Sequence, residues 1–178
     1  MPVLFFSIID EKHRMKIMEK IEYVPIGIIH SPFTTIEEMP IQPAGGSAVR
    51  GKIILFDEYI SALKDLDGFS HVVLLYHFHK VKSWKPLVTP FLDTEQHGLF
   101  STRAPRRPNP IGLSVVKLVE ISANTVWVEN MDILDGTPLL DIKPYIPAFD
   151  EPDEVRIGWL EGHDKAAAAQ RSDTRFKD

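Results

Sequence analysis

The segment from Ser101 to Ser114 is rich in arginine and proline. Arg103, Arg106 and Arg107 lie in an eight-residue stretch that also holds three prolines. Proline fixes φ and lacks a backbone donor, so this stretch can form neither a helix nor a central strand. Guanidinium forks on so stiff a loop suit a carboxylate or a phosphate, and rigidity reduces the entropy lost on binding. The segment indicates an anion-binding loop, with a solvated basic turn as the alternative.

Acidic residues gather in a second segment, from Asn130 to Tyr145. Asp132 is expected at the end of a strand, and Asp135 opens the turn Asp-Gly-Thr-Pro. Carboxylates at such a rim could hold ribose hydroxyls or offset the charge of a sulfonium ion. Aspartate beside glycine also forms Asx turns, so a purely structural role stands beside the binding role.

Three histidines fall on one face of an expected strand, because His77, His79 and His71 are separated by even steps. The spacing resembles a pair of metal ligands, but no third ligand lies at matching spacing. We therefore expect no metal site, and we assign these rings to stacking or hydrogen bonding. Trp84 and Trp127 are assigned to packing rather than to stacking on a base.

The scaffold for these groups is predicted to consist of short strands. We expect strands at 23–30, 50–56, 71–79, 98–102, 111–121, 125–132 and 138–142, and a further one at 154–160. Residues 31–47 form a loop long enough to be functional, 57–66 suit a short helix, and 122–124 suit a hairpin turn. Many short strands with little helix favour an antiparallel barrel or sandwich.

The composition is that of one globular domain, with 178 residues, 44% apolar, and a net charge of −5. This charge argues against nucleic-acid binding through overall charge, so a local basic patch would be needed. No stretch approaches the ~18 apolar residues of a membrane span. The absence of cysteine excludes disulfides and thiolate chemistry and is compatible with the cytoplasm. We expect an N-terminal extension over 1–20, the domain over 21–160, and a tail over 161–178.

Four motifs occur in a fixed order along residues 21–147. They are PIGIIHSPF at Pro25, DGFSHVVLLYHFH at Asp67, STRAPRRPNPIGLSVVKL at Ser101 and DILDGTPLLDIKPYIP at Asp132. Together they resemble the TrmO/TsaA-like family of S-adenosylmethionine-dependent tRNA methyltransferases. The resemblance implies a single, mainly antiparallel β-barrel with one or two short helices, which usually pairs as a homodimer. The ten glycines form no GxGxxG, so a Rossmann methyltransferase finds no support.

The resemblance also implies a reaction and a set of contacts. Characterised members methylate N6 of N6-threonylcarbamoyladenosine next to the anticodon of tRNA. Carried over by position, the contacts to S-adenosylmethionine are Gln42, Pro43, Ala44, His79, Lys80, Arg103, Leu113, Glu129, Asn130, Met131 and Asp132. Where the family has Gln-Pro-Gly, this chain has Gln42-Pro43-Ala44 followed by two glycines.

Several roles follow as hypotheses. Arg103 would pair with the methionine carboxylate, and Asp132 or Glu129 would lie near the sulfonium or ribose. Arg106 and Arg107, with Lys80, Lys82 and Lys85, would offer a local basic surface to tRNA phosphates. The acceptor nitrogen must lose a proton, and spacing does not choose a general base among His30, His71, His77, His79, Asp135 and Tyr145.

Two alternatives remain open at this point. The first is a methyltransferase with a different substrate, because the cofactor motifs constrain the acceptor poorly. The second is a non-catalytic module that binds S-adenosylmethionine or RNA.

Overall fold

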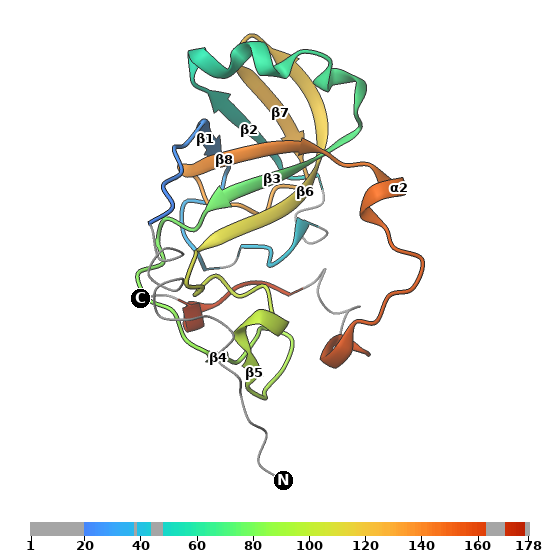
Figure 1. The fold of residues 1–178 in the computed structure, drawn as a ribbon. Coiled ribbons are helices and arrows are strands. Elements are labelled where there is room, and N and C mark those ends of the chain that lie inside the picture. Colours follow the sequence, from blue (N-terminus) through green and yellow to red (C-terminus); the bar gives the residue numbers. More distant parts are fainter. Residues whose placement is uncertain (1–19, 38, 44–47, 163–169, 177–178) are drawn as a thin grey trace, which may run out of the picture.

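The computed structural model describes residues 20–37, 39–43, 48–162 and 170–176. They build a closed barrel of six antiparallel strands in the order β1-β2-β7-β6-β3-β8, with a loop-rich region at one end (Figure 1). The predicted single antiparallel barrel with short helices is confirmed. The expected N-terminal extension lies almost wholly outside the described residues.

The barrel strands are β1 (Gly27–His30), β2 (Arg50–Leu55), β3 (His71–His77), β6 (Ile111–Ser122), β7 (Thr125–Glu129) and β8 (Thr137–Pro144). A separate two-stranded sheet joins β4 (Leu87–Val88) to β5 (His97–Gly98). The short helices are η2 (Asp57–Leu63), η3 (Leu66–Gly68), η4 (Leu99–Ser101), α2 (Pro147–Asp150), η5 (Gly158–Leu160) and η7 (Thr174–Phe176). No described helix has the length and apolar character needed to cross a membrane.

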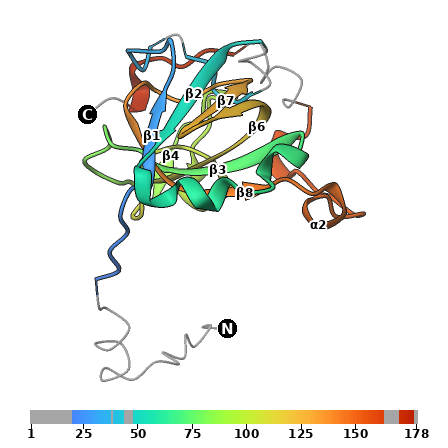
Figure 2. The same cartoon turned by 90° about the horizontal axis from the view of Figure 1, so that it is seen from above.

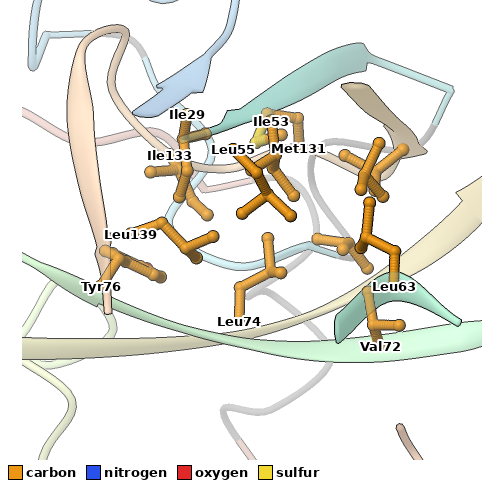
Figure 3. Close-up of a cluster of buried hydrophobic side chains, with 13 residues drawn as sticks. Ile29, Ile53, Leu55, Leu63, Val72, Leu74, Tyr76, Met131, Ile133 and Leu139 are labelled. Atoms are coloured by element: carbon orange, nitrogen blue, oxygen red, sulfur yellow. The ribbon is translucent and has the colours of Figure 1, made fainter. Parts of the chain in front are cut away.

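Successive side chains of a strand point to opposite faces, and this alternation decides what the barrel encloses. In β3, every second side chain points inward, so Val72 and Leu74 are fully buried while their neighbours are not. Figure 3 shows these side chains meeting Ile29, Ile53 and Leu139 from other strands. Helix η2 covers one end of the barrel and adds Leu63 to the same core.

Two predicted strands are wrong, and both lie outside the barrel. In place of a strand over 98–102, only His97–Gly98 pairs, and the chain turns at once into η4. In place of a strand over 154–160, the chain forms a loop that ends in η5. Without a neighbouring strand, an apolar run gains no ladder of hydrogen bonds, and composition alone cannot supply one.

A second, smaller apolar cluster lies outside the barrel core. It contains Val88, Leu99, Ala104 and Phe176, with Phe91 packed against it. Phe176 comes from the tail segment 170–176, which passes beneath the barrel near β4 and β5 in Figure 1. Viewed from above, α2 projects to one side, away from this cluster (Figure 2). The loops beneath the barrel therefore have a packed core of their own.

Candidate functional site

A cavity of about 800 Å³ lies between the lower end of the barrel and the loop-rich region. Its walls come from segments far apart in the chain: residues 36 and 39–43, the end of β3, loops 90–92 and 100–107, the start of β6, and residues 132–137. Segments 159–160 and 172–176 complete it. The volume falls in the range of small-molecule and cofactor sites. The Arg/Pro segment and the Asp132 segment therefore face one shared cavity.

A chain of three hydroxyl and carboxyl groups runs along the barrel end of this cavity. Ser114 Oγ donates to Asp132 Oδ1 at 2.7 Å, and Tyr76 Oη lies 3.0 Å from Ser114 Oγ. Because the single Ser114 proton is directed at Asp132, the Tyr76 hydroxyl donates to Ser114. The ring of Tyr76 lies against Gly112, where a Cβ would overlap it. Gly112 thus allows the close approach that builds this chain.

Asp132 is the single carboxylate among the described residues that line the cavity. Burial raises its pKa to about 6, and the hydrogen bond from Ser114 and the charge of Arg103 only partly oppose this effect. Burial first and the Asp132 charge second also raise the pKa of Tyr76, so its hydroxyl stays protonated. The cavity therefore holds one carboxylate that titrates close to neutral pH.

His79 follows β3 and also lines the cavity. Its Nδ1 lies 3.3 Å from Thr137 Oγ1, and Thr137 Oγ1 donates to the Leu134 carbonyl at 2.7 Å. Thr137 must then accept from His79, which places the proton of the neutral ring on Nδ1 and leaves Nε2 as an acceptor. Burial lowers the pKa of His79, and the charges of Lys80 and His77 lower it further. A neutral His79 can receive a proton through Nε2.

The turn that follows Asp132 is tied to the first strand. The Asp135 carboxylate accepts from the Ser31 amide at 3.1 Å and lies 3.2 Å from His30 Nδ1, while Ser31 Oγ donates to the Ile133 carbonyl at 2.6 Å. Gly136, at φ 74°, allows the tight turn and donates to the Ile29 carbonyl. These bonds hold the start of loop 31–43 beside the Asp132 segment.

The tail segment 170–176 contributes to the wall of the cavity that is formed by loops rather than by the barrel. Ser172 Oγ donates to the Ile36 carbonyl, and the Ser172 amide donates to the Met39 carbonyl at 2.9 Å. Arg175 Nη1 donates to the Pro90 carbonyl at 2.7 Å, and the Phe176 ring packs edge-on against Phe91. The tail therefore joins loop 36–43 to loop 90–92, and Ser172 and Phe176 both line the cavity.

The three arginines of the Arg/Pro segment have different surroundings. Arg103 is exposed at the cavity, while Arg106 is 9% exposed and so offers little surface to RNA. Arg107 Nη1 donates to the Thr102 carbonyl at 2.9 Å and, more weakly, to those of Leu99 and Ala104. Arg107 thus fixes the loop, and Arg103 is the guanidinium that remains available to a ligand in the cavity.

Most of the cofactor contacts expected from sequence lie in the cavity wall. Those that line it are Gln42, Pro43, His79, Lys80, Arg103, Leu113 and Asp132. Ala44 lies outside the described residues. Of the general-base candidates, His79 lines the cavity, whereas His30, His71, His77, Asp135 and Tyr145 do not. Lys82 and Lys85 are exposed on the loop after β3.

Three expected contacts do not line the cavity. Glu129 is held by Arg50 and Lys117, at 3.0 and 2.9 Å, on the outside of the barrel. These two cations lower the pKa of its carboxyl group. Asn130 has φ 66°, and Met131 is fully buried against Gly51. Of the run Glu129–Asp132, only the last member therefore lines the cavity.

Sequence reasoning missed several residues of the cavity wall. Ile133 and Leu134 follow Asp132 directly and Thr137 comes shortly after them, and the quoted motif DILDGTP contained all three. Trp159 and Phe176 lie in the region that carried no motif, so nothing in the sequence tied them to the cavity. Among the described residues, no three His, Cys, Asp or Glu side chains gather closely enough to hold a metal ion.

Comparison with known proteins identifies the domain. The model of the tRNA-methyltransferase O N-terminal domain family matches residues 28–151. A probable S-adenosyl-L-methionine-binding protein of Pyrococcus abyssi is 52% identical, with 86% of this chain and 84% of that protein covered. A human tRNA (adenine(37)-N6)-methyltransferase is 36% identical, with 74% of this chain and 31% of that protein covered.

A solved structure agrees with these matches. The crystal structure of TrmO from Pseudomonas aeruginosa aligns with a TM-score of 0.67 at 38% identity, and covers 79% of this chain. The alignment spans 63% of that protein, so this chain corresponds to about two thirds of the solved relative and about a third of the human one. The family match covers the barrel from Ile28 onward and most of the cavity wall, but not the lining residues at 159–160 and 172–176. On this basis the chain belongs to the tRNA-methyltransferase O N-terminal domain family.

Proposed function

We propose that this chain is an S-adenosylmethionine-dependent methyltransferase that methylates N6 of a threonylcarbamoyl-modified adenosine next to the anticodon of tRNA. The observation that carries the proposal is the shared cavity, which is lined by both the exposed guanidinium of Arg103 and the buried carboxyl group of Asp132. The names of the relatives support both the cofactor and the reaction. Because the human and Pseudomonas proteins are longer, their activity is carried to this chain as a proposal.

The residues of the cavity match the chemistry of this cofactor. The Arg103 fork suits the methionine carboxylate, and the Asp132 carboxylate suits the sulfonium or the ribose. Leu113, Ile133 and Leu134 supply apolar surface for an adenine ring. When bound, the cofactor supplies an activated methyl group, and the role of the protein is to hold the acceptor in line with it.

The acceptor proton requires a base within reach of the cavity. Nε2 of neutral His79 is one acceptor, and the Asp132 carboxylate is another. We propose His79 as the base, because its depressed pKa keeps the ring neutral at pH 7, while Asp132 is held by the Ser114 hydroxyl. Saturating S-adenosylmethionine removes the effect of Asp132 on cofactor binding, so the test uses kcat under this condition. Loss of the pH dependence of kcat in His79→Gln would support this assignment, and an unchanged profile would refute it.

The decisive experiment has two parts. Isothermal titration of the purified chain with S-adenosylmethionine tests binding, and incubation with labelled cofactor and threonylcarbamoyl-modified or unmodified tRNA tests transfer. We expect the labelled methyl group to appear in the threonylcarbamoyl-modified tRNA and not in the unmodified tRNA. Cofactor binding without transfer to any tRNA would favour the non-catalytic module, and transfer to another acceptor would favour the alternative enzyme.

We further propose that the protein acts as a homodimer in the cytoplasm and docks tRNA through Lys80, Lys82 and Lys85 beside the cavity. Val119 and Trp127 leave apolar surface on the outer face of β6 and β7, which suits a subunit contact. Sedimentation of the wild type and of Trp127→Glu tests the dimer, and cell fractionation tests the location. Substituting two lysines should flatten the salt dependence of tRNA binding by a slope of about 2.

A further inference from the structure

Phe100 stands apart from the other aromatic side chains of the cavity wall. Its side chain is 80% exposed, whereas Tyr76 and Phe176, which line the same cavity, are buried. It lies on η4, at the mouth of the cavity and three residues before Arg103. A large apolar ring that combines solvent exposure with a place in the cavity wall is suited to contact a ligand that enters from solvent.

Arg107 holds this ring in place. Its guanidinium carbon lies 5.7 Å from the centroid of Phe100, a cation–π distance. The same guanidinium is fixed by the Thr102 carbonyl at 2.9 Å, so the support is anchored to the backbone of the loop. A ring held in this way loses little conformational freedom when a partner stacks on it.

A second aromatic pair is tied to the same turn. The Trp159 indole Nε1 donates to the Ser101 carbonyl at 2.8 Å, and Trp159 lines the cavity. Its ring stacks on His97 with centroids 4.4 Å apart and an interplanar angle of 18°. His97 is fixed in turn by the Asp93 carboxylate at 2.9 Å. Phe100 and Trp159 both line the cavity, and Trp159 is hydrogen-bonded to the residue next to Phe100. We call this pair of residues the aromatic mouth.

The charge around the aromatic mouth favours a nucleotide. Lys80, Arg103 and Arg107 line the cavity, and Asp132 is the one acidic side chain that does so among the described residues. Enzymes that act on a base take it out of its stack and commonly hold it between aromatic side chains. The acceptor must also approach the methyl group to within about 3–3.5 Å, so it has to enter this same cavity.

We propose that Phe100, braced by Arg107 and flanked by Trp159, is the stacking surface on which the unstacked acceptor adenine enters the cavity. This inference rests on the proposed function, and it adds the residues that select a planar base as the substrate. Phe100 and Trp159 contact the acceptor, while Arg107 and His97 are positioning residues.

The test compares Phe100→Ala with Phe100→Tyr, and uses Phe149→Ala as a matched control. Phe149 is 81% exposed, but it lies on α2 and does not line the cavity. Steady-state methylation of threonylcarbamoyl-modified tRNA gives KM and kcat, calorimetry gives the Kd for S-adenosylmethionine, and sedimentation gives the oligomeric state. All measurements use the full chain.

For Phe100→Ala we expect KM for tRNA to rise about tenfold or more, as loss of a base–aromatic stack implies, with Kd for the cofactor within twofold. Phe100→Tyr should retain most of the activity, and Phe149→Ala should match the wild type. Unchanged KM in Phe100→Ala would overturn the proposal. A parallel loss of cofactor binding would assign the ring to the cofactor, and a loss of dimers would assign it to a subunit contact, so either result also overturns it.

The outcome for the wild type separates this proposal from the function itself. A wild type that transfers no methyl group to any tRNA ends the proposed function, and the acceptor surface with it. If the wild type methylates tRNA and Phe100→Ala does so equally well, the proposed function stands and only the acceptor surface is refuted.

Discussion

The barrel core and the small cluster beneath it are two apolar cores of very different kinds. The barrel core is built by alternating residues of regular strands and contains many fully buried side chains. The small cluster is built by loops and short turns around Val88, Leu99 and Phe176. The ligand cavity lies between the two, with one wall from each. The barrel therefore provides rigidity, and the loops provide the groups that bind.

The largest effect is expected where only the barrel is changed. Leu74 is fully buried at the centre of β3, so Leu74→Ala should lower the free energy of unfolding by about 2–5 kcal/mol. Urea denaturation followed by circular dichroism measures this change. A loss below about 1 kcal/mol would mean that the barrel interior collapses around the missing side chain and is softer than its packing implies.

Asp132 lies at the boundary between the two cores, and its effect depends on pH. Its pKa is about 6 in the folded state, against an ordinary 3.8. Between these two values the folded protein binds the proton more tightly than the unfolded chain does. The contribution of Asp132 to stability is therefore fully present below about pH 4 and is lost as the pH rises through 6. The wild type should therefore lose about 3 kcal/mol relative to Asp132→Asn across this interval. The difference between the two unfolding free energies at pH 4 and pH 7.5 is the measurement.

The comparison between Asp132→Asn and the wild type also separates stability from function. The variant should be the more stable protein near pH 7.5 and yet bind S-adenosylmethionine more weakly, because the sulfonium loses its counter-charge. Equal cofactor affinity in the two proteins would show that Asp132 has a structural role only.

Arg103 tests the loop side of the cavity. Arg103→Ala should weaken the binding of S-adenosylmethionine by about 2 kcal/mol. Arg103→Lys keeps the positive charge and should recover part of this loss, but not all of it, because an ammonium cannot form a bidentate pair. Because Arg103 is exposed, the melting temperature without ligand should stay close to that of the wild type. Calorimetric titration gives the affinities, and wild-type affinity in Arg103→Ala would remove Arg103 from the ligand contacts.

Phe176 gives the smallest expected effect and the sharpest comparison. It belongs to the small cluster alone, so Phe176→Ala should leave the barrel transition unchanged but loosen the contact between the tail and loop 90–92. We expect threefold to tenfold weaker cofactor binding, about 1 kcal/mol, and faster proteolysis near the tail. If Phe176→Ala lowers the stability of the barrel as well as the affinity for the cofactor, the two cores unfold as one cooperative unit.

The sequence predicted the barrel well for a definite reason. The run around Val72, Leu74 and Tyr76 is rich in β-branched and aromatic residues, which are typical of strands, although Val73 and Leu75 between them are apolar as well. The closure of the sheet was expected from the family resemblance alone. The order of its strands was not predicted, because pairing partners leave no mark on a single strand. The helix expected over 57–66 forms as η2, which ends at Leu63.

The cavity was harder to predict because its walls depend on backbone turns. Asn130 has a left-handed conformation, after which Met131 enters the core and Asp132 lines the cavity. Asparagine adopts this conformation more readily than most residues, but its presence alone does not predict that the chain turns here. Arg106 and Arg107 look equivalent in sequence, yet one is buried and the other holds carbonyl groups of its own loop. Phe176 is separated from Phe91 by most of the second half of the chain, and only folding brings them together.

The pairing of β1 with β8 has a consequence for synthesis of the chain. Gly27 lies opposite Leu139, so the first barrel strand leaves the ribosome long before its second neighbour exists. Until then β1 has one open edge, and an open edge can pair with another nascent chain. Closure also demands a contact of high sequence separation, which slows folding. We therefore expect the yield of refolded protein to fall as the protein concentration rises, because chains that have not yet closed the barrel can associate through that edge.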